Sequence, residues 1–367
     1  MWPKSKVENS KLLGDLLERI EQTRAQVGDA WPYQADAQTG IWETVPDGDW
    51  CGGHYVECLR IKGVLEGRPD LIQEARERTE MLRPKLEKDD QFRGHRFYYS
   101  AARMYAQTGD PALRTLAMAA AYAMRSMAIP QNGAMPIGTE VQVRSTTLAS
   151  RRIVAVDNVH PNLRLDFWAW PETGDTVFRD GAKAMLDVTL RDFVRADGST
   201  VEFIEYDETE DRVLREFTLL GVNDHSCWSR GQAWAITGFM RGWTDFGEDR
   251  YREAALKTFD YWRDHSGYQA PAWDFLDPTG PADTSASAIV IEQLARMAVT
   301  DGANNKEFTQ HLQPMIDGLG EHMRPTGRLV NGCFNKPKEY ATDAELIWGS
   351  AYLIMALSYL EEGKVIC

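Results

Sequence analysis

The stretch Tyr105-Ala-Gln-Thr-Gly-Asp110 joins an amphipathic segment to an alanine-rich helical run over residues 111–127. The same pattern of turn and following helix recurs at Pro171-Glu-Thr-Gly-Asp175 before 178–194, at Trp243-Thr-Asp-Phe-Gly-Glu-Asp249 before 251–265, and more weakly at 62–70 before 71–86 and at 298–301 before 308–323. The copies lie roughly 50 to 70 residues apart, as expected for a repeated helix hairpin with variable loops. The repeat therefore predicts a chain dominated by helix pairs.

Longer segments separate these hairpins, and they contain glycine, proline and strand-like runs such as Val201-Glu-Phe-Ile-Glu-Tyr206. They cover residues 129–154, 196–222, 266–284 and 325–342. If short turns alternate with long loops, all the long loops fall at one end of a closed helical ring and surround one pocket. A linear solenoid would need more uniform repeats and capped ends. We therefore predict an all-α closed barrel of about six helix hairpins.

The beginning of the chain fits the same helical scheme. Apolar residues at helical spacing predict a first helix over 11–27, and helical spacing resumes over 50–64. Residues 29–50 between them are rich in turn formers and are expected to be a loop with exposed aromatic side chains. Length alone allows two or three domains or one large toroid. We predict that residues 1–367 form one catalytic domain.

Charge and composition exclude several classes of function. The 367-residue chain has a net charge of -14 and a pI near 5.1, which argues against nucleic acid or an anionic membrane as the main partner. The charged N-terminus has no secretory signal, and five cysteines without a CxxC pair suit reduced thiols, so we expect a cytoplasmic protein. We expect it to be a monomer or a homodimer. The seven histidines form no HExxH or Cys/His cluster, so we expect neither metal nor cofactor.

The stretch Asn223-Asp-His-Ser-Cys-Trp-Ser-Arg-Gly-Gln-Ala-Trp234 precedes an apolar helical run over 235–243 and is typical of a loop that enters a helix. Arg230 and Trp234 are four residues apart and so share one helical face. Flat aromatic surfaces beside a guanidinium, with Trp228 close by, suit a planar anionic ligand such as a uronic acid. The plain alternative is a core tryptophan pair with Arg230 in a structural salt bridge to Asp224 or Asp283.

With these motifs in hand, the chain resembles the unsaturated glucuronyl hydrolases of glycoside hydrolase family 88 and their relatives in family 105. The resemblance extends from about Trp50 to the end of the chain. It rests on Gly48-Asp-Trp50, Val156-Asp-Asn158, the TGD turns, Ser226-Cys-Trp-Ser-Arg-Gly-Gln-Ala-Trp234, Trp273-Asp-Phe275 and Asp283-Thr-Ser-Ala-Ser-Ala-Ile289. It implies an (α/α)6 barrel that removes a 4,5-unsaturated uronic acid from lyase-generated oligosaccharides by hydrating the vinyl ether double bond.

The resemblance also implies that Asp157 is the catalytic acid/base. Asp157 follows the apolar run Ile153-Val-Ala-Val156 at the junction of a long loop and a helix, where partial burial would raise its pKa. Asn158 could orient the carboxylate. The residues alone favour a different reading, in which Asp157 is a helix N-cap.

Several positions depart from the family pattern. Phe92 stands where the family has a second functional aspartate, so only Asp90, after a loop shift, could serve as that catalytic carboxylate. In the family, a histidine and a glutamine help to hold the uronate or its substituent. In this chain the position of the histidine falls near Glu202 and that of the glutamine near Leu220. The possible replacements are His54, Arg93, His95 and His225.

The predicted substrate contacts are Trp50, His54, His95, Asn158, Glu202, Trp228, Arg230, Gln232, Trp234 and Trp273. Arg230 is the expected partner of the uronate carboxylate. Asp283 is expected to be the N-cap of a helix over 286–297 as readily as a functional residue. Two other functions stay open: Glu202 could complete an exo-acting hydrolase of saturated β-glucuronides, which needs two carboxylates, or the protein could be a catalytically silent relative that binds uronides.

Overall fold

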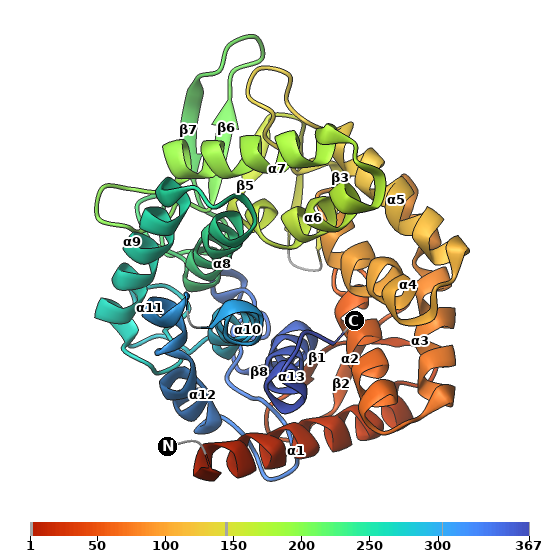
Figure 1. The fold of residues 1–367 in the computed structure, drawn as a ribbon. Helices are drawn as coiled ribbons and strands as arrows, with labels where there is room; N and C mark the ends of the chain where they lie inside the picture. The colour runs from red at the N-terminus through yellow and green to blue at the C-terminus, as the bar shows by residue number, and fades with distance from the viewer. Residues whose placement is uncertain (1–2, 144–145, 303, 367) are drawn as a thin grey trace.

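The computed structural model describes residues 3–143, 146–302 and 304–366, and helices dominate it. The helices form two concentric layers (Figure 1). The inner layer consists of α2 (Gly52–Leu65), the π-helical η2 (Gly94–Ala102) continued by α4 (Arg103–Thr108), α6 (Pro161–Thr173), α8 (Ser229–Phe246), α10 (Thr284–Asp301) and α13 (Ile347–Glu362). The outer layer consists of α1 (Pro3–Val27), α3 (Pro69–Met81), α5 (Pro111–Arg125), α7 (Thr176–Val188), α9 (Asp249–Ser266), α11 (Lys306–Thr309) and α12 (Leu312–Gly320).

Burial patterns explain why each helix lies in its layer. In α13 every residue from Ile347 to Tyr359 is buried, as expected of a helix enclosed by neighbours on all sides. In α9 only a stripe is buried, at Tyr251, Ala254, Ala255, Thr258, Phe259 and Trp262, a spacing that marks a helix with one wet face. The last inner helix, α13, packs against both α10 and α2 and so closes the ring. The predicted (α/α)6 barrel is confirmed.

The short turns have a simple local cause. Gly109 and Gly174 end α4 and α6 in the left-handed conformation, with φ of 70° at both, which glycine adopts without strain. Asp110 and Asp175 follow directly and cap α5 and α7, their side chains accepting from the backbone N–H of Ala112 and Val177. One turn therefore ends an inner helix and begins its outer partner.

The long loops carry three small antiparallel sheets. Their strands are β1 (Trp31–Asp36), β2 (Trp42–Val45), β3 (Gly138–Val143), β4 (Thr146–Ser150), β5 (Ile153–Ala155), β6 (Phe203–Tyr206), β7 (Val213–Phe217) and β8 (Ala344–Leu346). The sheet orders are β2-β1-β8, β3-β4 and β5-β6-β7. Short helical turns complete the loops: η1 (Arg83–Glu87), η3 (Val156–Val159), η4 (Thr189–Phe193) and η5 (Lys336–Lys338).

Two expectations for the N-terminal part are wrong. The first helix, α1, begins at Pro3 rather than near residue 11. The segment after it is not a loop with exposed aromatics: β1 and β2 form a hairpin that packs Trp31, Tyr33 and Trp42 into the core. Antiparallel pairing of β1 with β8 ties this hairpin to the start of α13, which explains its burial. Within the described ranges, no helix is long and apolar enough to cross a membrane.

Candidate active site

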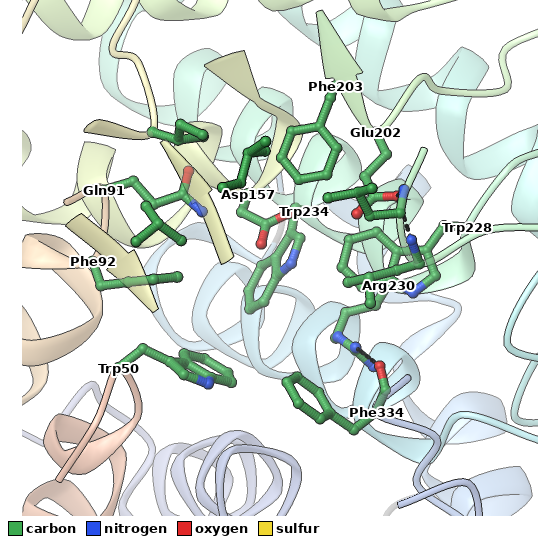
Figure 2. Close-up of a pocket in the computed structure, with 15 residues that line it drawn as sticks. Trp50, Gln91, Phe92, Asp157, Glu202, Phe203, Trp228, Arg230, Trp234 and Phe334 are labelled. Carbon is green, nitrogen blue, oxygen red and sulfur yellow. Dashed lines mark hydrogen bonds between the residues drawn. The ribbon is translucent and has the colours of Figure 1, made fainter. Parts of the chain in front are cut away.

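A pocket lies among the long loops and the first turns of the inner helices (Figure 2). Six of the predicted site residues line it: Trp50, Asp157, Glu202, Trp228, Arg230 and Trp234. The remaining wall is formed by Gln91, Phe92, Ile137, Val141, Leu148, Phe203, Leu219, Leu220 and Phe334. The cavity is thus an aromatic and aliphatic enclosure that contains two carboxyl groups and one guanidinium.

Asp157 lies on η3, directly after β5, and its carboxyl group faces the cavity beside Trp234 (Figure 2). Its side chain is partly exposed to the cavity, whereas its Oδ1 atom is buried and has no hydrogen-bond partner. Burial raises the pKa of Asp157 to about 6, and the charge of Arg230 opposes this rise. Asp157 caps no helix, because α6 begins only at Pro161 and η3 has no side-chain cap.

Glu202 is the second carboxyl group of the cavity and is 4% exposed. The backbone N–H of Val156 donates to the Glu202 carbonyl oxygen at 2.9 Å, which brings the segment that carries Glu202 beside Asp157. Its Oε2 atom accepts from the Thr218 hydroxyl and, at 2.9 Å each, from the N–H groups of Leu219 and Leu220. Burial raises the pKa of Glu202 to about 7, and the nearby charge of Asp157 adds to the rise.

Arg230 contacts three separate segments of the helical barrel. Its guanidinium forms a buried ion pair with Asp283, the N-cap of α10, and donates to the carbonyl oxygens of Cys333 at 2.9 Å and Phe334 at 2.8 Å. Its carbon Cζ lies 4.6 Å from the centre of the Trp228 ring. Both open readings of this arginine therefore hold in part: it faces the cavity, and its charge is paired with Asp283 rather than Asp224.

The aromatic walls come from elements far apart in the sequence. Trp50, just before α2, stacks at 19° on Phe334, with 6.4 Å between ring centres, and donates from Nε1 to the Tyr33 hydroxyl at 3.0 Å. Trp234 lies one turn into α8 and closes the floor (Figure 2). These rings offer flat apolar faces to a sugar.

Asp90 lies outside the cavity lining, contrary to its expected catalytic place. Both of its oxygens are engaged by Arg96, at 2.8 and 2.9 Å, and the N–H of Phe92 donates to it as well. The Phe92 side chain lines the cavity instead. A buried bidentate ion pair holds Asp90 in place, so the structure supplies the second carboxyl group of the cavity through Glu202.

Three more predicted contacts lie outside the lining of this cavity. Asn158 does not orient Asp157: it donates to the Met135 carbonyl oxygen at 2.7 Å and accepts from Asn162. Gln232 donates to the carbonyl oxygens of Gly198 and Thr258, at 2.8 Å each. Trp273 lies in a separate depression, where its Nε1 donates to Asp277 at 2.9 Å.

The predicted histidines lie beneath the cavity rather than in its lining. His54 packs against Tyr99 and Tyr352, and burial lowers its pKa to about 3. His95 packs under Trp50 and Trp234, at ring distances of 5.2 and 5.7 Å, and burial holds its pKa well below the usual range. Both imidazoles are therefore neutral and support the floor.

The two other candidate cations, Arg93 and His225, do not reach the cavity either. Arg93 donates to the carbonyl oxygens of Asp90 and Lys88, and His225 lies exposed at the surface. Across the described parts of the chain, no three His, Cys, Asp or Glu side chains gather as a metal site requires. No local pattern pointed to Phe334, Leu219 or Phe203, because their places in the wall depend on how separate loops meet.

Comparison with known proteins supports the predicted resemblance. The model of Glycosyl Hydrolase Family 88 matches residues 221–361. An unsaturated glucuronyl hydrolase of Formosa agariphila is 30% identical over 56% of this chain and 54% of its own length, and one from Bacillus sp. GL1 is 29% identical over 55% and 57%. The chain thus spans about half the length of the curated relatives it matches.

The solved structures extend the likeness to the whole fold. The crystal structure of the unsaturated glucuronyl hydrolase of Bacillus sp. GL1 matches with a TM-score of 0.86 over 98% of both chains at 23% identity. An unsaturated glucuronyl hydrolase specific for heparin matches with a TM-score of 0.85 over 98% of both chains at 21% identity. The chain is therefore similar to glycoside hydrolase family 88 in sequence, and it has the (α/α)6 fold of the unsaturated glucuronyl hydrolases.

Proposed function

We propose that this protein is a glycoside hydrolase that removes a 4,5-unsaturated uronic acid from the non-reducing end of a lyase-generated oligosaccharide. The observation that carries the proposal is Asp157, a carboxyl group at the wall of an aromatic cavity with a raised pKa and a buried oxygen that has no hydrogen-bond partner. The relatives with similar sequences, whose names are unsaturated glucuronyl hydrolase and unsaturated chondroitin disaccharide hydrolase, support the same substrate class.

The chemistry needs one group that first gives and then takes a proton. In the unsaturated ring, C4 and C5 form an enol ether with the ring oxygen, so protonation of C4 by Asp157 places positive charge on C5 and the ring oxygen. Water adds to C5 and returns a proton to Asp157. The resulting hemiketal opens to a ketone, and the hemiacetal left at C1 expels the neighbouring sugar. A pKa of about 6 keeps a share of Asp157 protonated near neutral pH.

The aromatic walls provide the position for this step. We expect a flattened unsaturated ring to lie against the aromatic side chains of Trp50, Trp228 and Trp234, which would exclude bulk water from the reacting carbons. Direct cleavage of a saturated glycoside instead requires two carboxyl groups on opposite sides of the bond. The names of the relatives, unsaturated glucuronyl hydrolase, favour an unsaturated substrate over this alternative.

The test is a comparison of two substrate classes. Unsaturated disaccharides absorb ultraviolet light through the conjugated double bond, and the wild-type protein is expected to abolish this absorbance. A chromogenic saturated β-glucuronide is expected to stay intact under the same conditions. Release of the chromophore without loss of absorbance from any unsaturated disaccharide would refute the proposal. The expected cytoplasmic location and monomeric or homodimeric state stay predictions.

A further inference from the structure

The two oxygen atoms of the Glu202 carboxyl group have different surroundings. Oε2 accepts hydrogen bonds from the Thr218 hydroxyl and from the N–H groups of Leu219 and Leu220. Oε1 is buried and has no hydrogen-bond partner. Because three donors occupy Oε2, a proton on this carboxyl group must reside on Oε1. The loop at 218–220 thus fixes which oxygen carries the proton.

The charges around Glu202 favour that neutral form. Asp157 faces it from η3, and Arg230 from α8 lines the same cavity with its charge paired with Asp283. The three donors of the segment over 218–220 oppose the neutral form, because they lower the pKa of Glu202, but burial outweighs them. The carboxylates behind this segment, Asp224 and Asp274, accept from the N–H groups of Thr218 and Val222. Phe203, Leu219 and Leu220 complete an apolar surrounding, and among the described residues no cation pairs with Glu202.

We propose that Glu202 recognises the substrate as a neutral carboxylic acid, donating a hydrogen bond from Oε1 to the carboxylate of the bound uronate. The inference rests on the proposed function, because it assigns the partner of that substrate's anion to Glu202 in place of Arg230, whose guanidinium is paired with Asp283. A uronate carboxylate has only acceptor atoms, so an ionised Glu202 would repel it. A protonated Glu202 forms a charge-assisted O–H···O⁻ bond with the same group.

This role separates Glu202 from Asp157. Asp157 transfers its proton to the substrate carbon, whereas Glu202 keeps its proton throughout and holds the ring. The free enzyme must then carry two protons in the cavity to be active. The logarithm of kcat/KM should therefore fall with a limiting slope of about minus two above roughly pH 8, since both acids ionise near neutrality.

The test is the variant Glu202→Gln. The glutamine oxygen accepts the three hydrogen bonds now made to Oε2, which leaves the amide NH2 at the position of Oε1 as a permanent donor. We expect the variant to keep kcat/KM within about tenfold of wild type at pH 6 and to show an alkaline slope of about minus one, because only Asp157 still titrates. The surface variant Glu205→Gln, whose native side chain pairs with Arg215, is the matched control and should keep a slope of about minus two.

Two results would overturn the inference. Equal slopes of about minus one in wild type and Glu202→Gln would show that the Glu202 proton is not required. A folded Glu202→Gln variant that is at least about 100-fold less active at every pH would show that an ionised Glu202 takes part in the chemistry.

A binding measurement separates this inference from the proposed function. Quenching of tryptophan fluorescence by saturated glucuronate reports occupancy without turnover. Above about pH 7 the affinity of wild type should fall more steeply than that of Glu202→Gln, by roughly tenfold per pH unit. If wild type leaves every unsaturated disaccharide intact, the proposed function fails, whereas parallel binding curves in wild type and variant overturn the role of Glu202.

Discussion

Replacing Arg230 and Asp283, singly and together, tests whether their buried ion pair holds the cavity wall. Arg230 is 2% exposed and Asp283 is 0% exposed. Arg230→Met leaves the Asp283 carboxylate without its partner, and Asp283→Asn leaves the guanidinium with neutral acceptors only, the carbonyl oxygens of Cys333 and Phe334 and the Ser285 hydroxyl. Each single change strands a buried charge, which costs about 3–5 kcal/mol of the free energy of unfolding. Asn keeps the cap on the Ser285 N–H, so the loss reflects charge rather than capping.

The double variant removes both charges at once. It retains the volume of the arginine stem and the capping oxygen, so no unpaired charge stays in the core. We expect its cost to be smaller than the sum of the two single costs by at least about 2 kcal/mol. Urea unfolding at constant pH, followed by tryptophan fluorescence and by circular dichroism, gives the four free energies. The two probes must agree for the comparison to hold.

Additivity would refute this reasoning. If the single costs sum to the double cost within about 0.5 kcal/mol, the two side chains do not act as a pair. Single costs below about 1 kcal/mol would equally show that the pair is solvated and that the loop at 333–334 is held by other contacts.

Two further predictions concern packing and pH. Gly53→Ala places a Cβ atom against the carbonyl oxygens of His95 and Arg96, closer than van der Waals contact allows, so it should lower the free energy of unfolding by about 1–3 kcal/mol. Gly14→Ala on α1 meets nothing within 4 Å and should raise the free energy of unfolding by about 0.5–1 kcal/mol. Equal changes for the two variants in urea unfolding would contradict the close contact of α2 with η2. Burial raises the pKa of Glu202 above its unfolded value of 4.5 to about 7, so wild type should lose stability as pH rises through this window, and the stability of Glu202→Gln relative to wild type should grow by up to about 3 kcal/mol between about pH 4.5 and pH 8. A constant difference between the two proteins across this range would show that Glu202 is ionised in the fold.

The sequence was sufficient for the fold because each hairpin carries its own signal. Glycine at a left-handed helix end and aspartate at the next N-cap are local requirements, so Gly109 and Asp110 identify a turn wherever they occur. The strand-like run that contains β6 was equally readable from alternation. The hairpin β1–β2 was not, because the burial of Trp31 and Tyr33 depends on pairing with β8, far away in the chain.

The site was predictable only where residues belong to one motif. Trp228, Arg230 and Trp234 share the start of α8, and their spacing places them together. Asp90 and Glu202 show the limit of this reasoning. Nothing local reveals that Arg96 engages Asp90 or that the loop at 218–220 turns its N–H groups toward Glu202, since both facts depend on tertiary contacts.

The most direct test of the central claim is the activity of Asp157→Asn on an unsaturated disaccharide. Asparagine keeps the shape of the side chain but has no acidic proton to transfer. We predict that kcat/KM, followed by loss of ultraviolet absorbance, falls roughly 10³-fold while glucuronate still quenches tryptophan fluorescence with an affinity within about threefold of wild type. A variant that keeps more than about a tenth of the wild-type rate would show that another group delivers the proton.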